Sequence, residues 1–188
     1  SVRWSAAFSG LKKPVVGLVV GGATKRRPFT KQMIVKLGCQ TANLVDKFGG
    51  SLVISTSPRT GNLLTGILNC LSERNIEPDF VYSWGSGDLA NDNPYIGILD
   101  CADHLIVTGE STSMCSEACA TDNTVHIFAP KGFLSQKHQR LIDELVSTGY
   151  AYLLQDKLVE FLPLSAPKKL DVATQIAQEI HIRILSKF

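Results

Sequence analysis

Residue types that bind phosphate follow the first apolar run of this 188-residue chain. Gly21 and Gly22 stand there beside the cations Lys25, Arg26 and Arg27. Glycines expose backbone N–H groups to an approaching anion, and cations neutralise its charge. The Gly-x-x-x-x-Gly-Lys-Ser/Thr and Gly-x-Gly-x-x-Gly patterns are absent, so the sequence supports neither a P-loop ATPase nor a typical NAD dehydrogenase. The alternative interpretation is a tight turn with a solvated basic tip.

A second stretch combines hydroxyls with the start of a helix. Gly109, Ser111, Thr112 and Ser113 lead directly into a segment of helical character. Backbone N–H groups and the helix dipole at such an end favour a pyrophosphate. Glu117 follows about one turn later, where its two carboxylate oxygens can accept both hydroxyls of a ribose. The alternative is a surface glutamate that the helix dipole stabilises.

Two further loops are expected at strand ends. Arg59 and Thr60 follow Ser57-Pro58, and a guanidinium there can grip phosphate. A polar stretch at 85–93 ends at Asn93, followed by Pro94-Tyr95, and is long enough for a binding loop. Its acidic residues can hold a sugar, a metal or only water. Turn and capping chemistry alone is the alternative for both loops.

Three other chemistries fit these residues less well. Gly109-Glu110-Ser111-Thr112-Ser113 nearly matches the Gly-x-Ser-x-Gly nucleophile elbow, but Ser113 replaces the last glycine and no convincing triad follows. A serine hydrolase acting through Ser111 therefore stays a minor alternative. Hydride transfer is disfavoured because no Tyr-x-x-x-Lys pair accompanies a glycine fingerprint. We expect no metal and no cofactor, since the four histidines lie far apart: His104, His126, His138 and His181.

The apolar pattern predicts alternating strands and helices. Strands are expected at 15–20, 51–56, 80–84, 105–107 and 125–128, with an edge strand at 150–154. Helices are expected at 30–48, 60–71, 93–102, 114–121, 135–147 and 168–185. Thr30 and Thr60 are expected to cap the first two helices, and Gly49-Gly50 to end the first. A doubly wound parallel α/β sheet of the Rossmann type follows, with ligands at the carboxyl ends of its strands.

Composition sets the broad class. The chain is 44% hydrophobic and 19% charged, with a net charge of +2, which indicates one globular core and no nucleic-acid partner. Its five cysteines form no Cys-x-x-Cys pair and predict free thiols in a reducing, cytoplasmic compartment. No apolar run reaches the ~20 residues that span a bilayer, although peripheral membrane contact is left open.

The chain begins at Ser1 without an initiator methionine, which suggests that an upstream domain is absent from it.

The residues around Glu117 resemble the donor-binding motif of GT-B glycosyltransferases. In that superfamily, Ser/Thr residues and a helix glutamate hold the diphosphate and ribose of a nucleotide sugar. A wider set of residues resembles the mitochondrial fission "elongated mitochondria" family, whose bacterial members are often labelled nucleoside-diphosphate-sugar epimerases. The set spans about residues 14–149: Val20-Gly21-Gly22 with Lys25, Thr56 to Thr60, Asn93-Pro94-Tyr95, Ala102-Asp103, Val107 to Met114 and Ser116-Glu117-Ala118.

This resemblance implies the carboxyl-terminal, donor-binding half of a GT-B-like glycosyltransferase, inactive as this fragment alone, with a nucleotide sugar as ligand and an acceptor domain upstream. It also implies the domain organisation of the chain, a connecting segment at 1–13 followed by a nucleotide-sugar-binding domain at 14–188. The residues themselves support sugar-nucleotide binding and argue against epimerisation. The family's fission label also leaves a non-catalytic adaptor as an alternative. At residues 26–29, Arg-Arg-Pro-Phe departs from the family's more aromatic and polar stretch.

Overall fold

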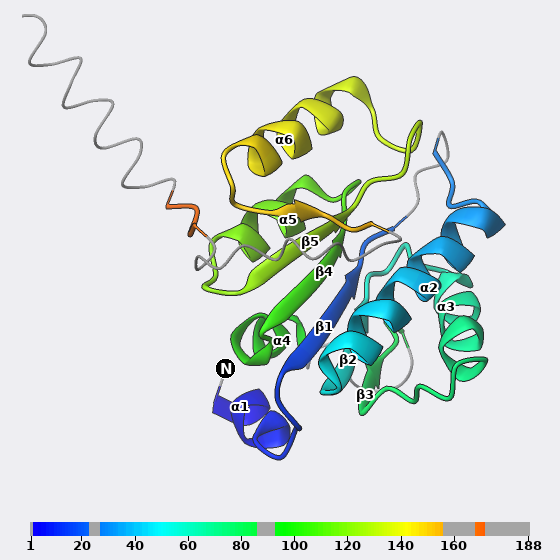
Figure 1. The fold of residues 1–188 in the computed structure, drawn as a ribbon, viewed down its shortest axis with the longest axis vertical. Coiled ribbons are helices and arrows are strands. Elements are labelled where there is room, and N and C mark those ends of the chain that lie inside the picture. Colours follow the sequence, from blue (N-terminus) through cyan, green and yellow to red (C-terminus); the bar gives the residue numbers. More distant parts are fainter. Residues whose placement is uncertain (1, 23–26, 86–92, 156–167, 172–188) are drawn as a thin grey trace, which may run out of the picture.

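The computed structural model describes residues 2–22, 27–85, 93–155 and 168–171, and these form a parallel α/β sheet covered by helices (Figure 1). Its strands are β1 (Val15–Val20), β2 (Ser51–Thr56), β3 (Phe80–Tyr82), β4 (His104–Thr108), β5 (Thr124–Phe128) and β6 (Tyr152–Leu153). Its helices are α1 (Val2–Phe8), α2 (Lys31–Phe48), α3 (Leu63–Ser72), α4 (Tyr95–Cys101), α5 (Thr112–Cys119) and α6 (Gln136–Ser147).

The sheet has the order β3-β2-β1-β4-β5-β6, and all of its pairs are parallel. Strand order reverses between β1 and β4. At Val16, β1 pairs with Leu52 of β2 on one side and with His104 of β4 on the other. In open α/β sheets, the crevice that takes a ligand lies where strand order reverses, outside the carboxyl edge of the strands. The predicted doubly wound, Rossmann-like class is confirmed.

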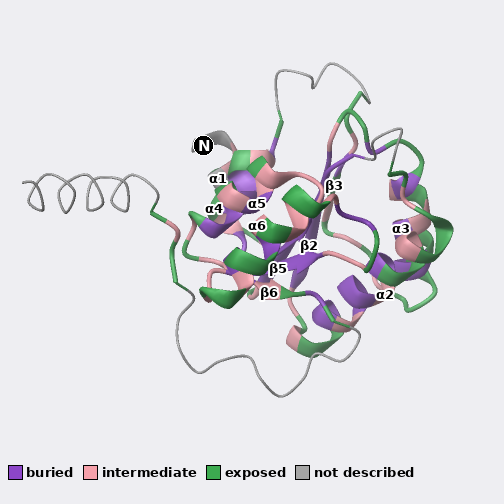
Figure 2. Ribbon diagram, turned by 90° about the horizontal axis from the view of Figure 1, so that it is seen from above, coloured by how far each residue is buried: buried purple, intermediate pink, exposed green. Residues whose placement is uncertain are grey.

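Strands form where β-branched residues are buried on both faces of the sheet. Every residue of β1 and β2 is buried, and Figure 2 shows the buried residues concentrated along the central strands. Val16, Leu18 and Val20 pack with α2 and α3 on one face. Val15 and Val19 pack with the residues of α4, α5 and α6 on the other. The two cores fix the register of the strands and so the positions of the loops.

Two of the three expected capping features of the first two helices are confirmed. The Thr30 hydroxyl accepts a hydrogen bond from the Met33 N–H at 3.2 Å, and Gly49 ends α2 in the left-handed conformation with a φ of 65°. The prediction for Thr60 is wrong. Helix α3 begins two residues later, after Asn62, because the Thr60 hydroxyl is occupied by the carbonyls at the end of β1.

Other boundaries differ by a few residues. The third strand ends at Tyr82 rather than at residue 84, and the Trp84 N–H donates to the Thr56 hydroxyl at 3.0 Å instead of continuing the ladder. Helix α5 begins at Thr112, two residues before the expected start. The edge strand at 150–154 is present as β6. The helix expected at 168–185 lies outside the described residues, except for 168–171.

The segment predicted to be a connection contains α1, which packs against the sheet and α4. The Trp4 and Phe8 rings stack at 5.5 Å, and both contact the ring of Phe80 on β3. A Cβ on Gly97 would lie 2.2 Å from the Trp4 Cβ, so glycine is what lets α4 approach α1 this closely. Phe8 therefore belongs to the hydrophobic core of the domain, and Trp4 packs against it. A link to an upstream domain stays a prediction.

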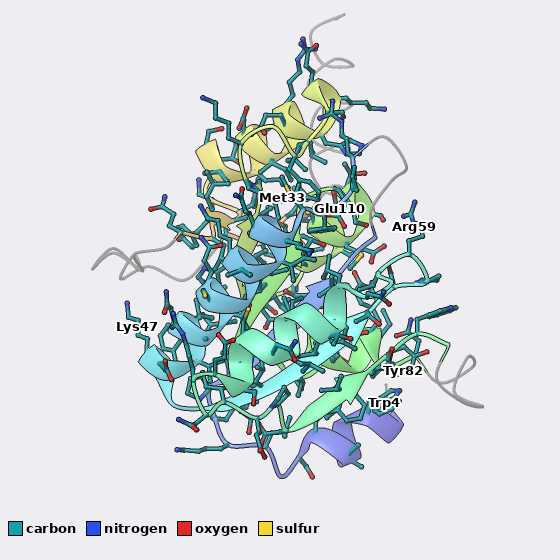
Figure 3. All side chains as sticks on the ribbon, turned by 90° about the vertical axis from the view of Figure 1, so that its right-hand side faces the viewer. Trp4, Met33, Lys47, Arg59, Tyr82 and Glu110 are labelled. Atoms are coloured by element: carbon teal, nitrogen blue, oxygen red, sulfur yellow. The ribbon has the colours of Figure 1, made fainter. Side chains whose placement is uncertain are left out.

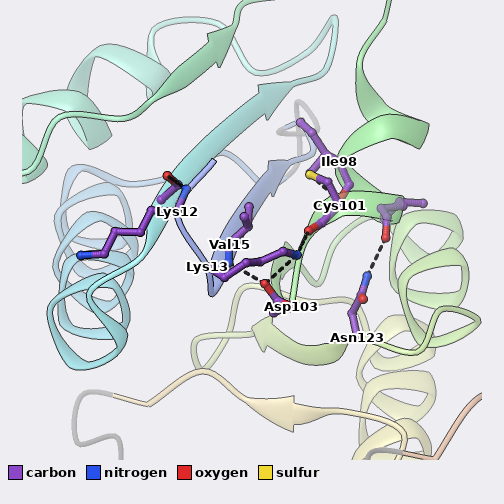
Figure 4. A network of polar contacts seen from close by, with 9 residues as sticks. Lys12, Lys13, Val15, Ile98, Cys101, Asp103 and Asn123 are labelled. Atoms are coloured by element: carbon purple, nitrogen blue, oxygen red, sulfur yellow. Dashed lines mark hydrogen bonds and ion pairs between the residues drawn. The ribbon is translucent and has the colours of Figure 1, made fainter. Parts of the chain in front are cut away.

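A polar network holds the amino ends of β1 and β4 together (Figure 4). The Asp103 carboxylate accepts the Val15 N–H at 2.6 Å and lies 3.0 Å from the Lys13 ammonium. The same ammonium donates to the Cys101 carbonyl at 2.8 Å, while the Asn123 amide donates to the carbonyl of residue 99. These contacts anchor the two central strands at the edge opposite the crevice.

Candidate functional site

Three loops at the carboxyl edge are joined by side-chain hydrogen bonds. The Gly21 N–H donates to the Thr108 hydroxyl at 2.8 Å, which links the end of β1 to the end of β4. The Thr60 hydroxyl donates to the Gly21 carbonyl at 2.8 Å and links the loop after β2 to the same residue. Gly21 is thus held on both sides, and its N–H is engaged by Thr108.

Close packing explains why two glycines stand after β1. A Cβ on Gly21 would lie 2.1 Å from Oε1 of Glu110, and a Cβ on Gly22 would lie 2.0 Å from the Cβ of Arg59. Such distances are far inside van der Waals contact, so neither position accepts a side chain without movement. Both glycines are needed for the loops to approach one another.

Glu110 was given no role by the sequence prediction, yet its carboxyl lies at the centre of the three loops. It accepts a hydrogen bond from the Thr108 hydroxyl at 3.0 Å through Oε1. Its Oε2 is buried and has no partner among the described residues. Figure 3 shows Glu110 and Arg59 reaching from different loops at the same end of the molecule.

Burial raises the pKa of the Glu110 carboxyl to about 7. Hydrogen bonds from its own backbone N–H and from the Thr108 hydroxyl, together with the Arg59 charge, oppose the shift but do not cancel it. A carboxyl with this pKa exchanges its proton near neutral pH, which is the range in which general acids and bases operate.

The amino end of α5 offers free hydrogen-bond donors. Ser111 occupies the N-cap position, and its side chain makes no capping hydrogen bond. Within the described part of the chain, the N–H groups of Thr112, Ser113 and Met114 have no acceptor. Ser113 is exposed, and the Gly109 N–H is tied to the Phe128 carbonyl at 3.0 Å. Unpaired N–H groups at the positive end of a helix can bind an anion.

Tyr95 and Glu117 meet across the gap between α4 and α5. The Tyr95 hydroxyl donates to Oε2 of Glu117 at 2.5 Å. Burial, followed by this hydrogen bond and the charge of Glu117, holds the pKa of Tyr95 well above its usual value. The tyrosine therefore stays protonated and orients the carboxylate, which is otherwise exposed on α5. The Asn93 side chain accepts the Tyr95 N–H at 3.0 Å and fixes the start of α4.

A pocket of about 150 Å³ lies at the ends of β1 and β2, beside Tyr95. Its walls are formed by the strand ends, by the loop after β2, and by the starts of α4 and α5: Val19, Ser55, Thr56, Ser57, Pro58, Asn93, Tyr95 and Met114. It combines apolar walls with hydroxyl and amide groups, which suits a ring that carries polar substituents.

Among the cations of the first loop, Arg27 is the one within the described residues, and its guanidinium is bound by backbone carbonyls. Arg27 donates to the Leu134 carbonyl at 2.8 Å and to the Gly132 carbonyl at 3.2 Å, so it joins the loop to the segment before α6. Lys25 lies outside the described residues, and so does its expected contact with phosphate. The guanidinium of Arg59 is exposed at the rim of the crevice.

Of the predicted ligand-binding residues, Gly21, Gly22, Arg59 and Thr60 form one connected group with Glu110. Tyr95, Asn93 and Glu117 form a second group around the pocket. The residues that reasoning from sequence missed are Thr108 and Glu110. The signal for both was their place directly at the end of a buried parallel strand, where side chains face the crevice.

The described residues give no support to a metal site or to a serine hydrolase acting through Ser111. They contain no group of three metal-ligating side chains, and the Ser111 hydroxyl has no histidine partner among them. His126 instead faces His104, with 3.4 Å between Nε2 and Nδ1, and His138 lies at the start of α6. No described helix has both the length and the apolar character needed to cross a bilayer.

Comparison with known proteins settles the family. Residues 1–184 match the family described as Mitochondrial fission ELM1. The chain belongs to this family. The resemblance inferred from the loop motifs is thereby confirmed, and it extends beyond the residues 14–149 that carried it.

Two curated relatives give the scale of the similarity. The uncharacterized protein RP120 of Rickettsia prowazekii is 27% identical over 192 residues, which cover 96% of this chain and 53% of that protein. The mitochondrial fission protein ELM1 of Arabidopsis thaliana is 28% identical over 124 residues, which cover 66% of this chain and 27% of that protein. The chain thus spans about half the length of the first relative and about a quarter of the second.

Among solved structures, the chain is similar to the C-terminal domain of a glycosyl transferase group 1 family protein, LpcC, from Francisella tularensis. The TM-score is 0.45 and the identity 13%, with 77% of this chain and 81% of that chain covered.

Proposed function

We propose that this chain is the donor-binding domain of a glycosyltransferase of the GT-B type, which takes a nucleoside diphosphate sugar at the crevice between β1 and β4. The observation that carries the proposal is the meeting of the loops after β1, β2 and β4 at the point where strand order reverses. Open α/β sheets bind their ligands at this point.

The expected place of the diphosphate is the amino end of α5. The N–H groups of Thr112 and Ser113 are without acceptors among the described residues and stand at the positive end of the helix. Arg59 stands at the rim of the same crevice and supplies a cation that can pair with phosphate oxygens. Lys25 is the second expected cation.

The expected place of the nucleoside is the pocket beside Tyr95. Glu117, held by the Tyr95 hydroxyl, keeps one carboxylate oxygen for the hydroxyls of a ribose. The apolar walls, Val19, Pro58 and Met114 among them, suit an aromatic base.

These groups suggest the chemistry that the domain contributes. Glycosyl transfer releases a nucleoside diphosphate, and negative charge develops on the departing phosphate. Backbone N–H groups and cations fixed before the reaction stabilise that charge. The acceptor site and the base that activates the acceptor are proposed to lie on an upstream domain, so this chain alone is expected to bind the donor without turning it over.

Calorimetry with UDP-, GDP-, CMP- and ADP-sugars tests the proposal. At least one of them should bind to the folded chain, and the absence of heat with all of them would refute donor binding. Glu117→Ala should weaken binding of that ligand by about 1–3 kcal/mol, the usual loss for a charge-assisted hydrogen bond. Glu144→Ala, which removes an exposed carboxylate on α6, is the matched control and should leave the affinity unchanged.

A second candidate function is a non-catalytic adaptor in mitochondrial fission. Membership of the fission family favours it, as does the exposure of Trp84 and Ile96, 39% and 54%, on the surface near the crevice. The adaptor would be supported over the enzyme if the chain captures a fission protein, loses that capture in Trp84→Ser and Ile96→Ser, and binds no nucleotide sugar.

A further inference from the structure

Helices α2 and α3 pack side by side on one face of the sheet with unusually close backbones. A Cβ on Gly38 would lie 2.6 Å from the Cβ of Cys70, and a Cβ on Gly66 would lie 2.5 Å from Cγ2 of Ile34. Each helix thus presents a glycine to a side chain of the other. Small residues at these positions are what allow the close approach.

Two cysteines lie at this contact. Cys70 is buried on α3, and Cys39, next to Gly38 on α2, is partly exposed. Cys39 lies close enough to Cys70 across the helix interface to raise the pKa of its thiol. Both are free thiols in the structure. One turn further along, the Arg74 guanidinium donates to the Asn43 side chain, so the helices are also joined beyond the cysteines.

We propose that Cys39 and Cys70 are a redox modification site, at which a reversible disulfide joins α2 to α3. A disulfide forms between cysteines whose backbones already lie close together, and the Cys70 side chain packs directly on Gly38, the residue before Cys39, with 2.6 Å between its Cβ and the position of a Cβ on Gly38.

The reaction needs a disulfide oxidant, and oxidised glutathione is the chemical class that suits it. The Cys39 thiolate, which solvent can reach, attacks one glutathione sulfur, and one glutathione leaves as its thiolate. The Cys70 thiolate then attacks Sγ of Cys39, and the second glutathione leaves. Two protein thiols and one glutathione disulfide become one protein disulfide and two glutathione thiols, with the two thiol protons released to solvent or to the leaving thiolates.

Local electrostatics set the speed of the second step. Burial, the neighbouring Cys39 and the charge of Glu73 raise the pKa of Cys70, and only Arg74 opposes them. Because the thiolate is the attacking form, ring closure should accelerate as pH rises from 7 to 9. The site is therefore expected to respond slowly, to sustained oxidation.

The other cysteines lack a partner on a neighbouring element among the described residues. The Cys101 thiol points to the Ile98 carbonyl of its own helix at 3.7 Å. Cys115 and Cys119 are buried on a single helix, and the Cys115 thiol points to the Thr108 carbonyl at 3.9 Å. Oxidation should therefore select one pair.

The disulfide would act on the loops that precede the two helices. Helix α2 follows the loop of Gly21 and Gly22, and α3 follows the loop of Arg59 and Thr60. A covalent bond between the helices would restrict how far these loops can separate. The proposal concerns thiol chemistry alone and does not depend on nucleotide-sugar binding.

Peptide mapping after oxidation tests it. The folded chain is treated with oxidised glutathione at pH 8, alkylated and digested with trypsin. Residues 37–47, with Cys39, and residues 60–74, with Cys70, should appear as one linked peptide that dithiothreitol separates. Titratable thiols should fall from five to three.

Variants decide between outcomes. Cys70→Ser should stop at a mixed disulfide of glutathione on Cys39, and Cys39→Ser should leave Cys70 reduced. Cys101→Ser, which removes another partly buried cysteine, is the matched control and should form the link at the wild-type rate. A folded wild-type chain that keeps five thiols, retains glutathione on Cys39 without closing the ring, or links Cys39 to another cysteine would overturn the proposal.

Discussion

Replacing Glu110 by glutamine should change how the stability of the protein depends on pH. The folded carboxyl has a pKa of about 7, against an ordinary pKa of 4.5 for a glutamate in the unfolded chain. The folded state therefore holds its proton more tightly, and its stabilising effect is complete below pH 4.5 and lost as pH rises through 7. Glutamine keeps the size of the side chain and removes this titration.

The magnitude follows from the distance between the two pKa values. Each pH unit between them corresponds to about 1.4 kcal/mol, so ionisation of Glu110 weakens folding by about 3 kcal/mol between pH 4 and pH 8. The free energy of unfolding of the wild type, minus that of Glu110→Gln, should therefore fall by about this amount over the same range. The effect is this large because burial is the leading cause of the shift.

Urea denaturation of both proteins at half-unit pH intervals from 4 to 8 measures this difference, and Glu144→Gln controls for the loss of one negative charge on an exposed helix. Parallel profiles for the wild type and Glu110→Gln would refute the reasoning. Such a result would mean that Glu110 ionises in the folded chain as readily as in the unfolded one, and its assignment as a proton-exchanging group at the crevice would fall.

Three further predictions test contacts that hold the fold together, and urea denaturation measures each of them. Gly22→Ala should destabilise the fold by about 1–3 kcal/mol because its Cβ would lie 2.8 Å from the backbone of the second loop. Gly10→Ala, with open space around the new Cβ, should have little effect. Equal losses of stability in the two variants would contradict the close approach of the loops at Gly22. Trp4→Ala should cost about 2–3 kcal/mol by removing the ring that packs on α4 and β3, and a loss below about 0.5 kcal/mol would show α1 to be detachable. Asp103→Ala should cost about 1–3 kcal/mol because a strand N–H loses its acceptor, and Asp103→Asn, which keeps an acceptor oxygen, should recover part of that loss.

The strands and most helix boundaries could be predicted because local patterns determine them. The run at β1 is made mostly of valine, and Thr30 and Gly49 are good caps whatever surrounds them. The alternation of strands with helices predicted in turn a parallel sheet with right-handed connections. The general place of the site, at the carboxyl edge, came from the same topology.

The finer features of the site depend on contacts between residues far apart in the chain. Thr60 has the right type and position for a helix cap, but a carbonyl 39 residues away takes its hydroxyl. Arg27 looked like part of an anion-binding cluster, but it donates to two carbonyls more than a hundred residues later. The burial that shifts the pKa of Glu110 also arises from three separate loops. No local pattern reports such contacts.

The hydrogen bonds that meet at Gly21 have a consequence for the evolution of this domain. Thr60 and Thr108 lie 39 and 87 residues from the glycine, yet all three share one set of hydrogen bonds. Loss of the Thr108 hydroxyl would leave the Gly21 N–H without its acceptor, and gain of a side chain at Gly21 would displace Glu110. Among homologues these four positions should therefore covary, with substitutions at one accompanied by substitutions at the others. Their joint presence would mark members of the family that retain this crevice.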